Sequence, residues 1–125
     1  MTNALYVIGG KRFVATMRKA GADLDELREV NAQAARIAAP AVRRLVPRRT
    51  GTLAGSIRTG ATKRAGVIRA GRKSVPYAGV INYGWPAHHI RGVQYANYGV
   101  AATEPQWTRL YKDFVDKTMK QVRGA

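Results

Sequence analysis

Acidic residues are missing from a large central part of this sequence. Between Val30 and Thr103 there is no Asp or Glu over 74 residues, whereas the same segment carries twelve Lys and Arg. It holds a net charge of +12 out of +15 for the whole chain. Self-repulsion on this scale opposes compaction, and a surface of mixed charge would keep a protein equally soluble. We therefore expect this acid-free segment to face an acidic partner: nucleic acid, an anionic membrane or an acidic protein surface.

Cysteine and long apolar runs are also lacking. Because the 125 residues include no Cys, disulfides, thiolate metal sites and cysteine nucleophiles are excluded. No apolar run approaches the roughly 18 residues that cross a bilayer, so no membrane-spanning segment is predicted. The first ten residues have no basic stretch ahead of an apolar run, and we expect no secretory signal and synthesis in a cytoplasm.

The residue types needed for catalysis are sparse. His88 and His89 are adjacent, so their side chains diverge in either a strand or a helix, and no carboxylate lies within fourteen residues of them. The run Gly9, Gly10, Lys11 lacks the glycine spacing and the following Ser or Thr of a phosphate-binding loop. The sequence therefore predicts a protein that is not an enzyme, with no catalytic residue, metal ligand or cofactor.

Helical spacing dominates the first third of the chain. A short helix is expected over residues 11–20. A longer one starts near Asp23, whose side chain can cap it. Pro40 lies inside the second pattern, which predicts either a kink or two helices laid end to end. A helical region, residues 11–46, thus follows an N-terminal arm, residues 1–10. The apolar stripe of the longer helix recurs every three or four positions and consists of Leu24, Leu27, Val30, Ala34, Ile37, Ala38, Ala41 and Leu45.

A second amphipathic helix is expected at the end of the chain, over residues 103–123. Thr103 followed by Glu104 and Pro105 is typical of a helix start. The opposite face of this helix is charged. Its predicted apolar stripe consists of Trp107, Leu110, Tyr111, Phe114, Thr118 and Val122.

Closely spaced glycines change the pattern in residues 50–83. Residues 56–63 and 66–72 fit a pair of strands joined by a tight turn at 64–66, with one weakly apolar face and one basic face. Residues 76–83 fit a helix or a strand equally well.

Residues 84–102 then fit an ordered but irregular loop, and a loop of this length in a small domain is usually functional. The whole pattern predicts a single α+β domain, residues 1–125. In it, a long N-terminal helix and a C-terminal helix pack on a small antiparallel β-sheet.

Two motifs resemble the neck and tail-completion family of long-tailed double-stranded DNA phages, whose members include head-to-tail connector and minor tail proteins. Residues 46–57 resemble the signature Pro-x-x-Thr-Gly-x-Leu-x-x-Ser-Ile, and residues 75–84 are similar to Tyr-Ala-x-x-x-Glu-x-Gly. Asn82 stands where the family commonly has an acid. The order of helix, strand pair and final helix is also that of the family. The family-like residues are Pro47, Thr50, Gly51, Leu53, Ser56, Ile57, Tyr77, Ala78 and Gly84.

The first motif has a consistent physical interpretation. Thr50 and Gly51 favour a turn, and Leu53 would anchor a helical turn. Ser56 can bond to local backbone, and Ile57 would enter the core.

The resemblance implies a virion structural protein at the head–tail junction, as a neck, tail-completion or tail-terminator component. It implies a ring with six-fold or twelve-fold symmetry that contacts adjacent neck, connector and tail-tube proteins. Such a protein would be made in the cytoplasm of the host bacterium, bind no membrane, and contact transiting double-stranded DNA without specificity.

Two sets of residues are expected to make these contacts. The cations of the strand pair would line a DNA channel or meet an acidic protein ring, and both alternatives stay open: Arg58, Lys63, Arg64, Arg69, Arg72 and Lys73. The loop would contact neighbouring subunits through Trp85, His88, His89, Arg91, Tyr95 and Tyr98.

A non-enzymatic basic nucleic-acid-binding protein is the alternative. Neutralising phosphates with Lys and Arg releases counterions and gives affinity at low salt, and Tyr or Trp near arginine can stack on bases. No recognisable nucleic-acid-binding module accompanies this charge in the sequence.

Overall fold

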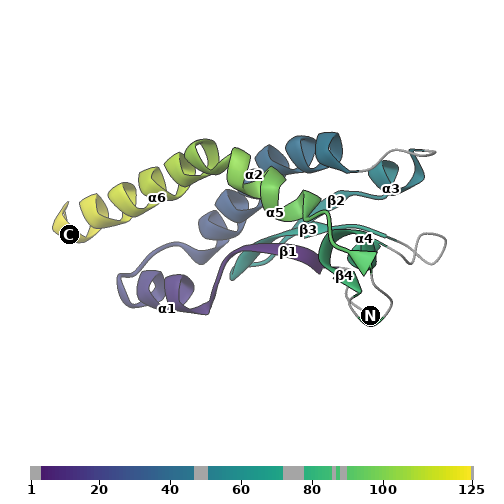
Figure 1. Cartoon of the computed structure of the whole chain (residues 1–125). Helices are drawn as coiled ribbons and strands as arrows, with labels where there is room; N and C mark the ends of the chain where they lie inside the picture. Colours follow the sequence, from purple (N-terminus) through teal and green to yellow (C-terminus); the bar gives the residue numbers. More distant parts are fainter. Residues whose placement is uncertain (1–3, 47–50, 72–77, 86, 88–89, 125) are drawn as a thin grey trace.

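The computed structural model describes residues 4–46, 51–71, 78–85, 87 and 90–124 (Figure 1). The fold is α+β, as predicted: a mainly helical chain with a small antiparallel sheet. The elements follow the order β1 (Ala4–Gly9), α1 (Lys11–Lys19), α2 (Leu24–Leu45), α3 (Thr52–Gly55), β2 (Arg58–Ala61), β3 (Ala65–Arg69), α4 (Ala78–Tyr83), β4 (Gly84–Trp85), β5 (Ile90–Arg91), α5 (Tyr95–Ala102) and α6 (Glu104–Gly124).

The N-terminal segment corrects one prediction, because residues 4–9 form strand β1 and not an arm. The three-stranded sheet has the order β1-β3-β2, and Ile8 lies opposite Gly66 across the β1–β3 pair. Ile8 is buried and Tyr6 packs on the core, whereas Val7 between them is exposed. This alternation is that of a strand with one covered face. Its partner lies more than fifty residues away in the sequence, so a local pattern could not reveal the pairing.

The predicted strand pair is confirmed as the β2–β3 hairpin, although both strands are shorter than expected. The turn lies at Lys63 and Arg64, earlier than the predicted turn, because the Thr62 N–H donates to the Ala65 carbonyl at 2.9 Å. The Thr62 hydroxyl also accepts hydrogen bonds from the N–H groups of Arg64 and Ala65. Strand β3 is central and is buried from Ala65 to Ile68.

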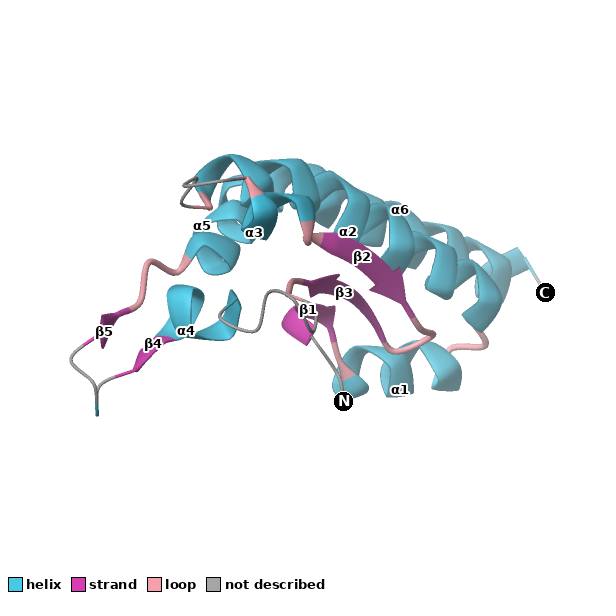
Figure 2. Cartoon of the chain, turned by 90° about the vertical axis from the view of Figure 1, so that its right-hand side faces the viewer, coloured by secondary structure: helices cyan, strands magenta, loops and turns pink. Residues whose placement is uncertain are grey.

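Helix α2 lies over the sheet and organises the core (Figure 2). As predicted, Asp23 caps it, and its side chain accepts the N–H groups of Asp25 and Glu26. The helix is continuous through Pro40, so the alternative of two helices is wrong. Pro40 lies on the exposed side, where water can supply the hydrogen bond that a proline ring cannot donate.

The buried face of α2 differs from the predicted stripe. Leu45 is 46% exposed, whereas the stripe prediction placed it inside. Small side chains dominate because the helix backbone packs closely on both β3 and α5. At Gly66 a Cβ would collide with the Asn31 backbone carbonyl, and at Gly99 it would lie 2.7 Å from the Val42 Cα. The buried residues are Leu27, Asn31, Ala34, Ala35, Ala38, Ala39, Ala41 and Val42.

The segment predicted as a loop, residues 84–102, is mostly regular. It contains the β4–β5 pair, with Gly84 opposite Arg91, and helix α5, which packs on α2. Residues 78–83, left open between helix and strand, form helix α4. The β4–β5 pair and the C-terminal end of α6 lie at opposite ends of the molecule in both views (Figures 1 and 2).

Helix α6 is confirmed as an amphipathic C-terminal helix and packs beside α2. A second, smaller core joins it to α1 and to the start of α2, through Val14, Met17, Leu27 and Phe114. The rings of Phe13 and Tyr111 meet edge to face with centroids 5.5 Å apart.

Candidate interaction surface

The described part of the first motif forms the junction between α3 and the sheet. Gly51 has a left-handed backbone with φ of 80° immediately before α3, and Leu53 and Ile57 are buried. The Ser56 hydroxyl donates to the Leu53 carbonyl at 2.7 Å and accepts the Gly71 N–H at 2.9 Å. The roles predicted for Leu53, Ser56 and Ile57 are thus confirmed. Pro47 and Thr50 lie outside the described residues.

Arg58, the first residue of β2, makes hydrogen bonds at the same junction. One of its guanidinium nitrogens donates to the carbonyls of Ser56 and Gly71, at 3.0 and 2.9 Å. The Arg43 guanidinium likewise donates to the Ile57 carbonyl at 3.0 Å. Arg58 was predicted to contact DNA or an acidic partner, but it is half-buried and its guanidinium holds backbone carbonyls.

The other predicted cations of the strand pair fall into four groups. The Lys63 ammonium lies 3.5 Å from a carboxylate oxygen of Asp25, with both side chains more than half exposed. The Arg69 side chain lies against Gly60 of the neighbouring strand. A Cβ added at Gly60 would be 3.3 Å from the Arg69 Nε. Arg64 is exposed at the hairpin tip. Arg72 and Lys73 lie outside the described residues.

Exposed and buried residues are mixed in the predicted subunit-contact loop. Arg91 is exposed and Tyr98 is 62% exposed, so both side chains are accessible. Tyr95 is fully buried, and its hydroxyl donates to the Ala78 carbonyl at 3.0 Å. The prediction of Tyr95 as a surface contact is therefore wrong, because its ring fills the core beside α4. His88 and His89 lie outside the described residues, as does the side chain of Trp85.

Residues of the second motif join α4 to α5. Ala78 is buried, and Gly84 has a left-handed φ of 81° at the start of β4; Tyr77 lies outside the described residues. Asn82 is fully buried, its side-chain oxygen accepts the Ala96 N–H at 2.8 Å, and its amide donates to the Asn97 side chain at 3.0 Å. It therefore satisfies one of the free N–H groups in the first turn of α5.

Two tyrosines are held in the neutral form by their surroundings. Burial, together with the neighbouring Tyr83, raises the pKa of Tyr95 to about 12. Burial raises the pKa of Tyr111 to about 12 as well. The Tyr111 hydroxyl donates to the Asn31 side-chain oxygen at 2.6 Å, and the Asn31 amide donates to the Thr62 carbonyl at 2.9 Å. Asn31 thus connects α6, α2 and the hairpin.

A groove between α2 and α6 gathers acidic residues that sequence reasoning assigned to helix starts and solvated faces. Val30, Leu110 and Phe114 form its apolar floor, and the rim consists of Glu26, Glu29, Gln33, Asp113 and Lys117. We call this the α2–α6 groove. Spacing along each helix could have indicated the rim, but only the packing of α6 beside α2 brings the two helices' residues together.

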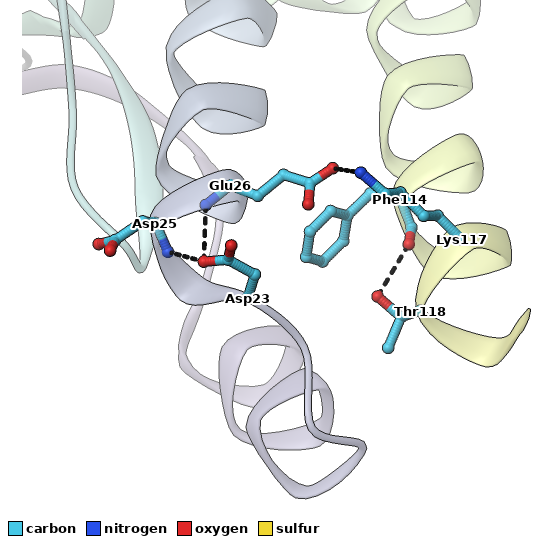
Figure 3. Close-up of polar contacts among 6 residues, drawn as sticks. All are labelled: Asp23, Asp25, Glu26, Phe114, Lys117 and Thr118. Carbon is cyan, nitrogen blue, oxygen red and sulfur yellow. Dashed lines mark hydrogen bonds and ion pairs between the residues drawn. The ribbon is translucent and has the colours of Figure 1, made fainter. Parts of the chain in front are cut away.

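Figure 3 shows one side of the α2–α6 groove, where Glu26 reaches from α2 to Lys117 on α6, above the Phe114 ring. The carboxylate and ammonium are 2.8 Å apart. Glu29 pairs with Arg36 at 3.0 Å. Among the described residues, Asp113 has no ion pair, so the groove rim keeps an uncompensated negative charge.

No group of three or more His, Cys, Asp or Glu that could hold a metal ion occurs in the described part of the chain. Within the same residues, no helix is long and apolar enough to span a bilayer.

Comparison of the chain with protein-family models, curated proteins and solved structures finds no match.

Proposed function

We propose that this chain is a structural subunit of the head–tail junction in a long-tailed double-stranded DNA phage. In this role it forms a ring, with six-fold or twelve-fold symmetry, that completes the tail or joins it to the head. It contacts neighbouring copies and the adjacent neck, connector and tail-tube proteins. The chain is made in the cytoplasm of the host bacterium and incorporated into the virion.

The observation that carries this proposal is the joint structural use of the two family-like motifs. Leu53, Ser56 and Ile57 of the first motif fix the chain between α2 and β2, and Ser56 bridges to Gly71 at the far end of β3. Ala78 of the second motif accepts the hydrogen bond of Tyr95. These motif residues hold neighbouring elements together. A family that shared this fold would therefore need to keep them.

The exposed cations support contact with an acidic partner. Arg64 and Arg91 are exposed, belong to the acid-free segment and have no ion pair among the described residues. They are available to transiting DNA or to an acidic ring above or below. Tyr98, also exposed, adds an apolar contact surface on α5.

The test is removal of the chain from the phage that encodes it. An early stop codon should yield DNA-filled heads and separate tails, seen by negative-stain electron microscopy. Supplying the wild-type chain from a plasmid should restore infectious particles. Mass spectrometry of purified wild-type particles should detect the chain. Complete virions without the chain, or a genome that carries no portal and tail genes, would contradict the proposal.

A non-enzymatic nucleic-acid-binding protein is the second candidate. A hollow at the hairpin tip supports it, because Arg28, Lys63 and Arg64 line that hollow together. Such a protein would bind DNA with an affinity that falls steeply as salt rises. It would also remain a small species in solution, where a ring component would form discrete oligomers.

A further inference from the structure

We propose that copies of this chain associate head to tail, with the C-terminal end of α2 of one copy docked in the α2–α6 groove of the next. The docking element is Arg44 with Leu45, which we call the basic tip. This inference rests on the proposed ring and assigns the two surfaces that build it.

The α2–α6 groove is suited to an apolar side chain with a cation beside it. Its floor of Val30, Leu110 and Phe114 is apolar. In a chain of net charge +15, its rim nevertheless holds three of the seven acids, Glu26, Glu29 and Asp113. Since the first two have internal partners and Asp113 has none among the described residues, Asp113 is the position where an incoming cation gains most.

The basic tip has the complementary composition. Leu45 is 46% exposed and lies at the C-terminal end of α2. Arg44 beside it is exposed and has no ion pair among the described residues. A leucine on the apolar floor, with an arginine next to Asp113, would bury apolar area and pair the two free charges together.

The proposed ring requires a head-to-tail contact between the two surfaces. Glu29 and Arg44 lie fifteen residues apart on the same helix, about 22 Å at the rise of an α-helix. Pairing two grooves would bring acids together, pairing two basic tips would bring arginines together, and a two-fold pair in which each tip entered the other groove would stop at a dimer. A contact between two different patches repeats from copy to copy and closes into a ring when its rotation allows.

The decisive experiment mixes two variants that are each defective in one patch. Asp113→Lys spoils the groove and keeps the basic tip, whereas Arg44→Glu spoils the tip and keeps the groove. Each variant alone should associate about tenfold or more weakly than the wild type. Their mixture should recover association, because an intact tip meets an intact groove at one contact and the two exchanged charges meet at the next. The double variant, with the charges exchanged, should recover association.

Mass photometry and sedimentation at low salt measure these species for the full chain. Asp116→Lys on α6 and Arg18→Glu on α1 make the same charge changes outside both patches and should associate as the wild type does. Leu45→Ser should weaken association at high salt as well, where charge pairing is screened. Circular dichroism confirms that each variant is folded before its mass is compared.

Three results would overturn the inference: single variants that associate like the wild type, a mixture that does not recover association, or a wild-type chain that stays a monomer or stops at a dimer. None of these three results contradicts the proposed function if virions still need the chain to join heads and tails. Conversely, head-to-tail oligomers from a chain that virions do not contain would uphold the contact and reject the function.

Discussion

The acid-free segment and the two flanks that enclose it handle charge in different ways. The flanks, residues 1–29 and 104–125, hold all seven acids together with ten of the 22 Lys and Arg. There the acids cap a helix or pair across helices, as Glu26 does with Lys117. In the acid-free segment Arg43 and Arg58 donate to backbone carbonyls instead. A count of charges therefore overstates how much of the segment is free to meet a partner.

A close packing contact inside the acid-free segment gives the largest predicted effect. Gly66→Ala should lower the free energy of unfolding by roughly 3 kcal/mol or more, because a Cβ would collide with the Asn31 backbone carbonyl. Chemical denaturation measures the change. The matched control is Gly79→Ala, since nothing lies within 4 Å of a Cβ built there, and it should change stability by less than about 0.5 kcal/mol. Equal effects at the two glycines would contradict the close approach of Gly66 to α2.

High pH should destabilise the fold through one buried tyrosine in each region, Tyr95 in the acid-free segment and Tyr111 in the C-terminal flank. The pKa values of Tyr95 and Tyr111 are raised to about 12 in the fold, above the usual tyrosine value of 10.0. Their contribution to stability is complete below pH 10 and is lost as pH rises toward 12, because the unfolded chain ionises first. The loss should reach roughly 2 kcal/mol for each tyrosine.

Tyrosinate absorbance and denaturation at a series of pH values measure this loss. Tyr95→Phe and Tyr111→Phe should each remove part of the alkaline sensitivity. A stability that does not change between pH 10 and 12 would contradict the buried, neutral state of both rings.

Asn82 allows an acid to be placed in the acid-free segment. Asn82→Ala should cost roughly 2 kcal/mol, since it leaves the buried Ala96 N–H without its partner at the start of α5. Asn82→Asp keeps an oxygen at that position and adds a favourable charge near a helix N-terminus, so it should lose less than Asn82→Ala. Thermal denaturation of both variants ranks them, and an aspartate variant less stable than the alanine variant would contradict the capping role.

Arginine substitutions test the division between structural and free cations. Arg58→Met should cost about 1 kcal/mol, because the carbonyls of Ser56 and Gly71 lose a donor. Arg64→Met should leave stability within about 0.5 kcal/mol. In binding to an acidic partner or to DNA the order should reverse, with Arg64→Met the weaker binder. If Arg58→Met and Arg64→Met lost equal stability and equal binding, the division between structural and free cations would be wrong.

Local signals predicted much of this molecule. The acids after Asp23, the spacing of the two long helices and the glycines around β2 and β3 all act within a few residues, and they gave correct elements. Ser56 and Ile57 were assigned correct roles for the same reason. Strand β1 was missed because its partner lies far away, and α5 was missed because Asn82, not a residue of its own first turn, completes its start.

By itself, the sequence determined the charge separation, the helix that starts at Asp23 and the hairpin between two helical regions, because each depends on residue types and short spacings. Only the tertiary structure decided which face of α2 is buried, since close packing of Gly66 and Gly99 selects small side chains on that helix. It also decided which arginines are free and brought Asp113 beside Glu26 and Glu29. These outcomes depend on contacts between segments that are distant in the chain, and no local pattern encodes such contacts.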